Sequence, residues 1–226
     1  NVKHEVVPNF GDLKMMLSCI RPDVEIRYTT DGSEPHEYSM LYRRPLIIKQ
    51  SQTVKCATFK DGKRVSQILE IPVQVSGTTG CNVLRSNSVE RRLVNGVRGS
   101  LKNTDGEWAS WGKNDSIALT FDVGARKRMG VVSLGYLNDF GLGIHKPQKV
   151  EVWLSDNDVH YWKATEQTFG RDEIFAEGRF TEEMELILKD VARYVRVIMK
   201  GAGKCPEHHV RPGLEAQIYL DEVLIE

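Results

Sequence analysis

Alternation of apolar and polar residues with a period of two is the feature that most restricts how this chain folds. The pattern runs through residues 13–19, 24–28, 54–57, 117–121, 131–136, 150–154, 184–188 and 195–199. Turn sequences such as Asp31-Gly32-Ser33 and Asp61-Gly62-Lys63 separate these runs. Apolar side chains at every second position form the buried face of a β-strand. We therefore predict an all-β fold, in which residues 173–178 form at most one helical turn.

The last predicted strand changes phase along its length. Ile218 and Leu220 occupy even positions, whereas Val223 and Ile225 occupy odd ones. One extra residue in a strand returns later side chains to the original face. We therefore predict a β-bulge at Asp221-Glu222.

A small, polar segment, Ser76-Gly77-Thr78-Thr79-Gly80, has the composition of a linker between domains. It divides the chain into residues 1–76, predicted to form a small β-sandwich, and residues 77–226. The second part begins with a stretch without clean periodicity, from Cys81 to Asn114, and continues with a series of short strands. This order predicts a jelly-roll sandwich with a long first loop.

Composition and charge exclude several classes of protein. The 226 residues include 31 Lys plus Arg and 31 Asp plus Glu, so the chain lacks the excess positive charge of a nucleic-acid-binding protein. No apolar run approaches the roughly 18 residues of a membrane-spanning helix. The chain begins Asn-Val-Lys-His, without methionine or a signal peptide, and we expect a fragment or processed product of a longer protein.

The four cysteines, Cys19, Cys56, Cys81 and Cys205, have no spacing typical of a metal site. Cys19 and Cys56 are in phase with inward-facing residues, which indicates buried free thiols. Cys81 and Cys205 lie in the second part, where the sequence is consistent either with a disulfide between them or with two free thiols.

The segment Ile26–Pro35, with the sequence Ile-Arg-Tyr-Thr-Thr-Asp-Gly-Ser-Glu-Pro, resembles the signature of the Ig-like domain at the C-terminus of chitobiases and β-hexosaminidases. The resemblance continues through residues 41–46 and 52–57 and covers about Phe10 to Ile71. Physically, the motif is a strand entering a tight turn, in which Gly32 can adopt positive φ and its neighbours can bond backbone amides. We interpret it as a folding device and not as a ligand site.

The segment Ser155–Trp162 resembles the Ser-x-Asp-Gly-x-x-Trp turn of the coagulation factor 5/8 C-type (F5/8 type C), or discoidin-like, domain. That superfamily includes the family 32 carbohydrate-binding modules. Residues 193–197 and 220–223 resemble its penultimate and closing strands. Residues 95–111 and 203–222 are similar to the variant that follows the chitobiase-type domain in bacterial glycoside hydrolases of family 20. The matches together span roughly residues 83–226, and the order of the two modules strengthens the resemblance.

In this superfamily ligands bind loops at one end of the sandwich, often the loop after the strand that matches Val131–Leu137. A sugar requires an aromatic or apolar face against its C–H surface and polar groups paired with its hydroxyls. The predicted ligand-binding residues are Asn138, Phe140 and His145 in this loop, with Trp108, His209 and Arg211 as neighbours.

The four tryptophans are expected to differ in burial. Trp111 and Trp162 are predicted to lie in the core, and Trp153, which is out of phase with Val152, is predicted to pack on a flank. Trp108 is consistent either with the core or with a ligand platform.

Many relatives hold a structural calcium ion near the start of this module. The resemblance places its ligands at Asn95, Val97, Ser100 and Glu222. Asn95 lacks the charge of the family's aspartate and Val97 offers only its carbonyl, whereas Ca²⁺ takes about six to eight oxygen ligands. We predict no cofactor except, at most, a calcium ion at Asn95, Ser100 and Glu222.

Family 20 glycosidases use an Asp-Glu pair, in which Glu protonates the leaving group and Asp orients the substrate acetamide. The pairs Asp172-Glu173 and Asp221-Glu222 do not end strands of a (β/α) repeat, and the chain has no room for such a barrel. No Ser-His-Asp arrangement, phosphate loop or zinc motif is present, and the adjacent His208 and His209 would point to opposite faces of an extended segment. We predict that the chain has no catalytic site.

The two resemblances imply a non-catalytic C-terminal accessory region of a secreted bacterial β-N-acetylhexosaminidase-like glycoside hydrolase, which binds glycan through loops of the second sandwich. The expected sugars are terminal galactose, N-acetylglucosamine or N-acetylgalactosamine, and the expected protein partner is the parent's catalytic domain. The implied location is periplasmic, cell-surface or extracellular. The alternatives are a purely structural module that packs on the catalytic barrel and a discoidin-like adhesion module.

Overall fold

The computed structural model of the protein describes residues 1–9, 11–87, 89–112 and 116–226. In these residues nearly all regular structure is antiparallel β-sheet, and the helices are the short 3₁₀ helix η1 (Glu90–Val94) and α1 (Arg171–Ile174). The all-β prediction is confirmed. The helical turn begins two residues earlier than predicted. Phe10, where the first resemblance starts, and Asn114, where the first loop was expected to end, lie outside the described residues.

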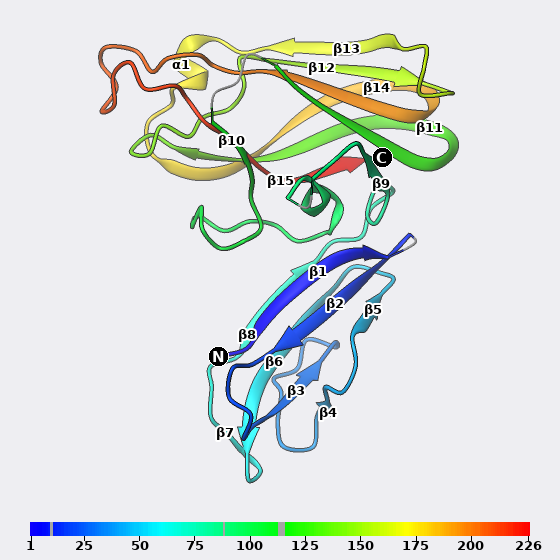
Figure 1. The fold of residues 1–226 in the computed structure, drawn as a ribbon, viewed down its shortest axis with the longest axis vertical. Helices are drawn as coiled ribbons and strands as arrows, with labels where there is room; N and C mark the ends of the chain where they lie inside the picture. The colour runs from blue at the N-terminus through cyan, green and yellow to red at the C-terminus, as the bar shows by residue number, and fades with distance from the viewer. Residues whose placement is uncertain (10, 88, 113–115) are drawn as a thin grey trace.

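Residues 3–73 form two antiparallel sheets (Figure 1). The first has the order β1-β2-β5, made of β1 (Lys3–Asn9), β2 (Asp12–Ser18) and β5 (Leu46–Ile48). The second has the order β4-β3-β6-β7, with β8 also paired to β6, and consists of β3 (Glu25–Thr29), β4 (Met40–Leu41), β6 (Gln52–Lys60), β7 (Lys63–Arg64) and β8 (Leu69–Val73).

An apolar core lies between these two sheets. Alternate residues of β2 supply one side of it, since Leu13, Met15 and Leu17 are buried while the residues between them are partly exposed. Cys56 of β6 is fully buried in the same core, as predicted, whereas Cys19 is only half-buried. The small β-sandwich expected here is therefore present, and its kinship with Ig-like domains stays a prediction.

The segment Ile26–Pro35 is a strand that ends in a tight turn. Gly32 has φ of +85°, and the carboxylate of Asp31 accepts hydrogen bonds from the Ser33 amide at 3.0 Å and the Ser33 hydroxyl at 2.6 Å. The Thr29 hydroxyl donates to the Ser33 carbonyl at 2.6 Å. These contacts close the turn upon itself, in agreement with its interpretation as a folding device.

The second half contains one large antiparallel sheet with the order β10-β15-β11-β14-β12-β13, and β9 also pairs with β11. Its strands are β9 (Asn82–Leu84), β10 (Ala109–Trp111), β11 (Ile117–Asp139), β12 (Lys149–Ser155), β13 (Trp162–Thr168), β14 (Arg179–Lys200) and β15 (Ile218–Ile225).

Two long strands make this sheet into a sandwich. β11 and β14 pair over residues 117–122 with 194–199, and again over residues 127–139 with 179–192. The register shifts between Asp122 and Lys127, where the two-stranded ribbon folds back on itself (Figure 1). β9 and β12 extend one layer and β15 the other, with the larger apolar core between them. The runs predicted as separate strands, 117–121 and 131–136, are thus two arms of one folded strand.

The β-bulge predicted in the last strand is confirmed. Leu134 pairs with Val223 and Tyr136 with Leu220, so two residues of β15, Asp221-Glu222, lie opposite Gly135. Both side chains of the bulge are buried. A Cβ atom on Gly135 would lie 2.0 Å from the Asp221 carboxylate, so the partner strand requires glycine at this position.

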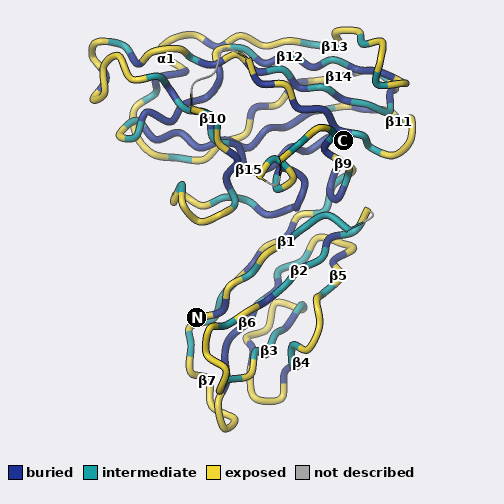
Figure 2. The backbone as a smooth tube through the Cα atoms, viewed as in Figure 1, coloured by how far each residue is buried: buried dark blue, intermediate teal, exposed yellow. Residues whose placement is uncertain are grey.

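The two halves meet at a narrow waist (Figure 1), where residues 95–97 of the second half contact the first half. The Gly96 amide donates to the Glu222 carboxylate at 3.0 Å, and the Gly96 carbonyl accepts from the Gln74 amide at 2.7 Å. Val97 is buried in the core of the first half and bridges to its last strand. Figure 2 shows that this junction is largely buried. The division at residues 76 and 77 stays a prediction.

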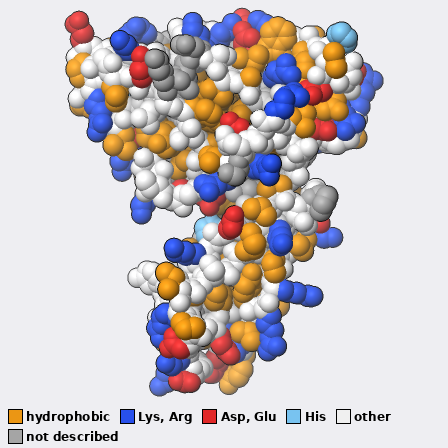
Figure 3. Space-filling view, in the orientation of Figure 1, with side chains coloured by type: hydrophobic (Ala, Val, Ile, Leu, Met, Phe, Trp, Pro, Cys, Tyr) orange, Lys and Arg blue, Asp and Glu red, His pale blue; other side chains and the backbone are white. Residues whose placement is uncertain are grey.

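Charges of both signs are interspersed over the surface seen in Figure 3. This distribution matches the equal numbers of acidic and basic residues in the sequence. No helix in the described part of the chain is long and apolar enough to cross a membrane.

Candidate functional site

Two loops come together at one end of the second sandwich (Figure 1). Loop A is residues 140–148, between β11 and β12, and loop B is residues 201–217, between β14 and β15. The His145 amide donates to the Gln217 carbonyl at 2.8 Å, and the Gln217 amide donates to the Gly143 carbonyl at 2.9 Å. The Arg211 guanidinium donates from Nε to the Gly141 carbonyl at 2.7 Å. The two loops therefore form one bonded unit.

Loop A begins with a tight, closed turn. The backbone groups of Asp139 and Ile144 bond to each other at 2.8 and 3.0 Å, and the Asp139 carboxylate accepts from the Leu142 amide at 3.0 Å. Gly143 has φ of +73°, and a Cβ atom there would lie 3.0 Å from Leu214 of loop B. Glycine at this position allows the close approach of the two loops.

A chain of side-chain hydrogen bonds lies beneath the loops. His145 Nδ1 is 3.1 Å from Asn138 Oδ1, and the Nε2 atoms of His145 and His209 are 3.0 Å apart. The Arg211 amide donates to His209 Nδ1 at 2.9 Å. Since that nitrogen accepts, His209 carries its proton on Nε2 and donates it to His145, which in turn donates from Nδ1 to Asn138. The Asn138 amide completes the chain by donating to two backbone carbonyls at 3.0 and 3.1 Å.

This chain requires both imidazoles to be neutral. Burial, with a smaller contribution from the neighbouring His209, lowers the pKa of His145 to about 4. Burial also lowers the pKa of His209, and the electrostatic influence of the neighbouring His208 and Arg211 adds to the effect. At neutral pH the pair is therefore an uncharged, hydrogen-bonded clamp between loops A and B.

Aromatic rings enclose the histidine pair. The ring of Phe140 lies over that of His209, with 4.0 Å between centroids, and the ring of Phe175 packs edgewise on His145 at 5.0 Å. Of the predicted loop residues, Asn138, His145 and His209 are at most 3% exposed, Phe140 is half-buried and Arg211 is exposed. The structure thus brings all five together, but only Phe140 and Arg211 face solvent.

Trp108 lies under loop A and not on its surface. It is 5% exposed and packs with Leu137 and Ile144, while its indole N–H donates to the Ser100 carbonyl at 3.1 Å. The sequence was consistent with Trp108 in the core or on a ligand platform, and the structure places it in the core. Trp108 supports the loop from beneath.

The other tryptophans differ in part from the prediction. Trp162 is 38% exposed, so its predicted core position is wrong. Trp111 is only half-buried, although it packs against the main core. Trp153 is half-buried on a flank, where its indole donates to Glu151 at 2.9 Å. Trp162 starts β13, the strand at the edge of the sheet, whose residues are all at least partly exposed.

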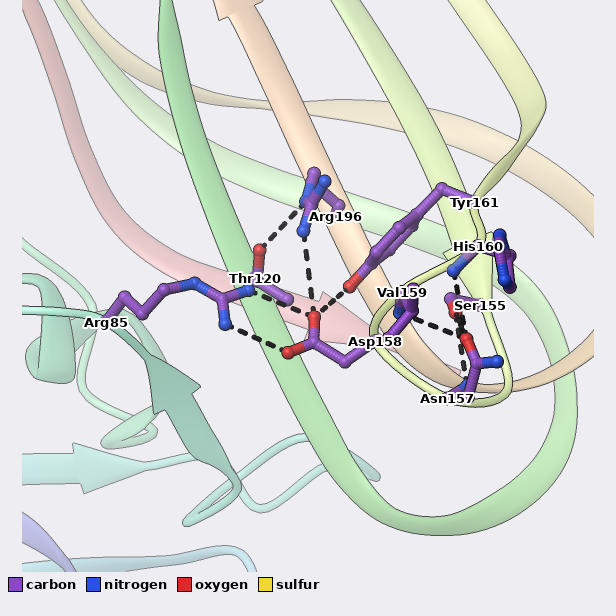
Figure 4. A network of polar contacts seen from close by, with 9 residues as sticks. All are labelled: Arg85, Thr120, Ser155, Asn157, Asp158, Val159, His160, Tyr161 and Arg196. Atoms are coloured by element: carbon purple, nitrogen blue, oxygen red, sulfur yellow. Dashed lines mark hydrogen bonds and ion pairs between the residues drawn. The ribbon is translucent and has the colours of Figure 1, made fainter.

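The turn that connects β12 to β13, residues 156–161, lies at the opposite end of the sandwich and is held by charge pairs (Figure 4). Asp158 has φ of +58° and accepts two hydrogen bonds from Arg85, at 2.9 and 3.0 Å. It also accepts from the Tyr161 hydroxyl, and the Arg196 guanidinium lies 3.7 Å above the Tyr161 ring. The hydrogen bonds from Arg85 and Tyr161 lower the pKa of Asp158 to about 2.

This turn borders a second candidate site. An open hollow of about 370 Å³ is lined by Asp156, Asn157, His160, Tyr161 and Trp162. The exposed indole of Trp162 provides an aromatic surface there, and the side chains around it are polar. None of these five residues is among the predicted ligand-binding positions, and Trp162 was predicted to lie in the core.

The residues proposed for calcium are only partly arranged for it. One carboxylate oxygen of the fully buried Glu222 has no hydrogen-bond partner, while the other accepts from Gly96. Burial raises the pKa of Glu222 well above its usual range. However, Asn95 Oδ1 already accepts from the Val97 amide, and the exposed Ser100 hydroxyl donates to Asp105 at 2.6 Å. The calcium site stays a prediction that rests on the free oxygen of Glu222.

The two Asp-Glu pairs, Asp172-Glu173 and Asp221-Glu222, make hydrogen bonds and ion pairs with neighbouring parts of the fold. Asp221 accepts from Arg98 at 3.2 Å and from the Gly99 amide at 2.9 Å, and Glu222 accepts from the Gly96 amide at 3.0 Å. In the other pair, the exposed Glu173 accepts from Lys146 at 2.7 Å.

Two members of the loop cluster, Phe175 and Cys205, were not among the predicted site residues. Cys205 of loop B is buried, and its Sγ lies with the imidazole nitrogens of His145 and His209 within 4.8 Å of one another. All four cysteines are free thiols, so Cys81 and Cys205 are not bridged. The spacing Cys205-x₃-His209 was the available signal, but its third member is about 60 residues distant in sequence.

The fold is that of an all-β protein with two successive β-sandwiches and a loop cluster at one end of the second. Residues 15–71 match the family described as Fn3 associated, nearly the span of the first resemblance. No curated protein matches the chain.

Several solved structures are similar to the chain at low identity. Chitosan-binding module 1 of a chitosanase/glucanase from Paenibacillus sp. IK-5 is 12% identical, with a TM-score of 0.43, over 68% of this chain and 99% of that one. The C-terminal domain of a chitobiase from Bacteroides fragilis is 13% identical, with a TM-score of 0.40, over 66% and 95%. CpGH89CBM32-4 of Clostridium perfringens, solved with GlcNAc-α-1,4-galactose, is 12% identical, with a TM-score of 0.40, over 67% and 94%.

Proposed function

We propose that the second sandwich is a non-catalytic glycan-binding module and that the sugar binds across Phe140 and Arg211. The observation that carries the proposal is the position of these two side chains. Arg211 is bonded to the backbone of Gly141, next to Phe140, and both are exposed at least in part at the end of the sandwich.

The chemistry of the pair suits a sugar. An aromatic ring packs against the C–H face of a pyranose, and the planar guanidinium has several N–H donors for its hydroxyls. Arg211 uses Nε for Gly141, which leaves its terminal N–H groups for a ligand. Phe140 rests on His209, so its ring is supported from below.

The buried members of the predicted set have a supporting role in this proposal. Asn138, His145 and His209 hold Phe140 and Arg211 in place through the hydrogen-bonded chain. A site held by packed, hydrogen-bonded residues loses little conformational freedom on binding, which favours recognition by a small contact area.

We further propose, on the resemblance alone, that the chain is the accessory region of a secreted, β-hexosaminidase-like glycoside hydrolase of bacterial type. The module would act outside the cytoplasm and hold the enzyme's catalytic domain near its glycan. Terminal galactose, N-acetylglucosamine and N-acetylgalactosamine are the sugars to test first.

Calorimetric titration with oligosaccharides that end in these three sugars tests the proposal. Phe140→Leu keeps an apolar side chain over His209 but removes the aromatic face, and Arg211→Gln removes the guanidinium. Each change is expected to weaken binding roughly tenfold, which corresponds to about 1.4 kcal/mol. Trp162→Ala, at the opposite end of the sandwich, is the matched control and should leave binding unchanged.

Two outcomes would overturn parts of the proposal. Binding that is lost in the Trp162 variant and retained in the other two would move the site to the hollow beside residues 156–161. Absence of binding by the unaltered chain to any glycan of an array would leave the structural-module alternative.

A further inference from the structure

We propose that His145, His209 and Cys205 form a binding site for a divalent transition-metal ion, with zinc as the best-suited ion. Two imidazoles and one thiolate are ligands that zinc prefers, and three protein ligands are sufficient when solvent occupies the fourth position. Its three side chains are buried, so they would not touch the proposed sugar themselves, although His145 and His209 also support Phe140 and Arg211.

The distances between the ligand atoms are close to those that zinc requires. Two nitrogens bound to one tetrahedral zinc ion lie about 3.3 Å apart, and a nitrogen and a sulfur lie about 3.6 Å apart. The two Nε2 atoms are already 3.0 Å apart, and one ring nitrogen of each histidine and the Cys205 sulfur lie within 4.8 Å of one another. A movement of the sulfur by about an ångström would complete the geometry.

The surroundings also resemble those of a metal site. His145 presents Nε2 toward the cluster because its Nδ1–H donates to Asn138, the type of outer contact that orients metal-binding imidazoles. The rings of Phe140 and Phe175 pack on the two histidines and keep bulk solvent away. Within the described residues, this is the one group of three His, Cys, Asp or Glu side chains with ligand atoms so close together.

Binding would rearrange protons in a defined way. The Cys205 thiol, whose pKa burial raises, would lose its proton to solvent as the Zn–S bond forms. His209 would transfer its proton from Nε2 to Nδ1, and that nitrogen could no longer accept from the Arg211 amide. One proton is therefore released per metal ion, and the backbone at Arg211 must move.

Cobalt(II) is the probe of choice, because a thiolate ligand to Co²⁺ gives a charge-transfer band in the near ultraviolet. The full chain, first treated with EDTA, is expected to bind one equivalent of Co²⁺ with this band, and zinc should displace it. Cys205→Ser is expected to abolish the band. His145→Gln removes a ligand and is expected to weaken zinc binding by at least roughly 10–100-fold, the loss typical when only an outer contact of a ligand is removed.

Two matched controls accompany these variants. Cys81→Ser removes another shielded thiol, and His208→Gln removes the exposed neighbour of His209; both should bind metal like the unaltered chain. Tryptophan fluorescence in urea checks that each variant is folded. Absence of the band in the unaltered chain, or equal zinc affinity of the unaltered chain and a folded Cys205→Ser variant, would overturn the proposal.

Discussion

Acidification is expected to destabilise the second sandwich through His145. The side chain is 1% exposed, and burial lowers its pKa from 6.5 to about 4. Between these two pH values the unfolded chain binds a proton at His145 that the folded chain does not bind. The stability contributed by the neutral histidine is therefore complete above pH 6.5 and is lost progressively as the pH falls toward 4.

The magnitude follows from the width of that window. Each pH unit within it costs about 1.4 kcal/mol of unfolding free energy, so a change from pH 6.5 to pH 5 costs about 2 kcal/mol. Other groups titrate as well, and the informative quantity is the difference from a His145→Asn variant. Asparagine can still donate to Asn138 but has no proton to gain in this range.

Urea unfolding followed by tryptophan fluorescence, with EDTA present, measures this difference. All four tryptophans, at positions 108, 111, 153 and 162, belong to the second sandwich, so the signal reports on the relevant half. The exposed His160, replaced by asparagine, is the control and should retain the pH dependence of the unaltered chain. A His145→Asn variant that loses as much stability between pH 6.5 and 5 as the unaltered chain would refute the reasoning.

Three further predictions concern the β-bulge in β15, the predicted calcium site and the charged turn at residues 156–161. Gly135→Ala should lower the free energy of unfolding by roughly 1–3 kcal/mol or more, because the new methyl group would lie 2.0 Å from the Asp221 carboxylate; an unchanged urea midpoint would contradict the described bulge. Calcium should raise the melting temperature of the unaltered chain but not of Glu222→Gln, and a melting temperature that responds neither to calcium nor to a chelator would eliminate the calcium site. Asp158→Asn should weaken the contact with Arg85 and destabilise by about 1 kcal/mol or less at pH 7, since the pair is partly exposed; chemical denaturation with and without salt measures this change.

The local alternation of apolar and polar residues was sufficient to predict much of the fold. The alternation in residues 13–19 correctly indicated which side of β2 is buried, and the phase change after Leu220 correctly located the bulge. Both follow from the period of two in a strand, which depends only on backbone geometry. The joining of residues 117–121 and 131–136 in one folded strand was not predictable, because the residues between them break the alternation.

The sequence correctly predicted most of the residues of the candidate site, but it did not predict which of them are exposed to solvent. Five of the six suggested side chains form one connected cluster, yet three of those five are buried beneath Phe140 and Arg211. Polarity made Asn138 and His145 look like surface residues. Their burial is possible because each finds a hydrogen-bond partner, and such partners come from distant parts of the chain.

The sequence by itself determined that this protein is made of β-strands, because alternation and turn residues act over a few neighbouring positions. It also determined the bulge in β15 and the tight turn at Gly32. Only the tertiary structure decided that Cys205 lies beside His145 and His209, since the folding back of β11 and β14 brings loops A and B to one end of the sandwich. Contacts between such distant segments depend on the register of whole strands, which no local pattern encodes.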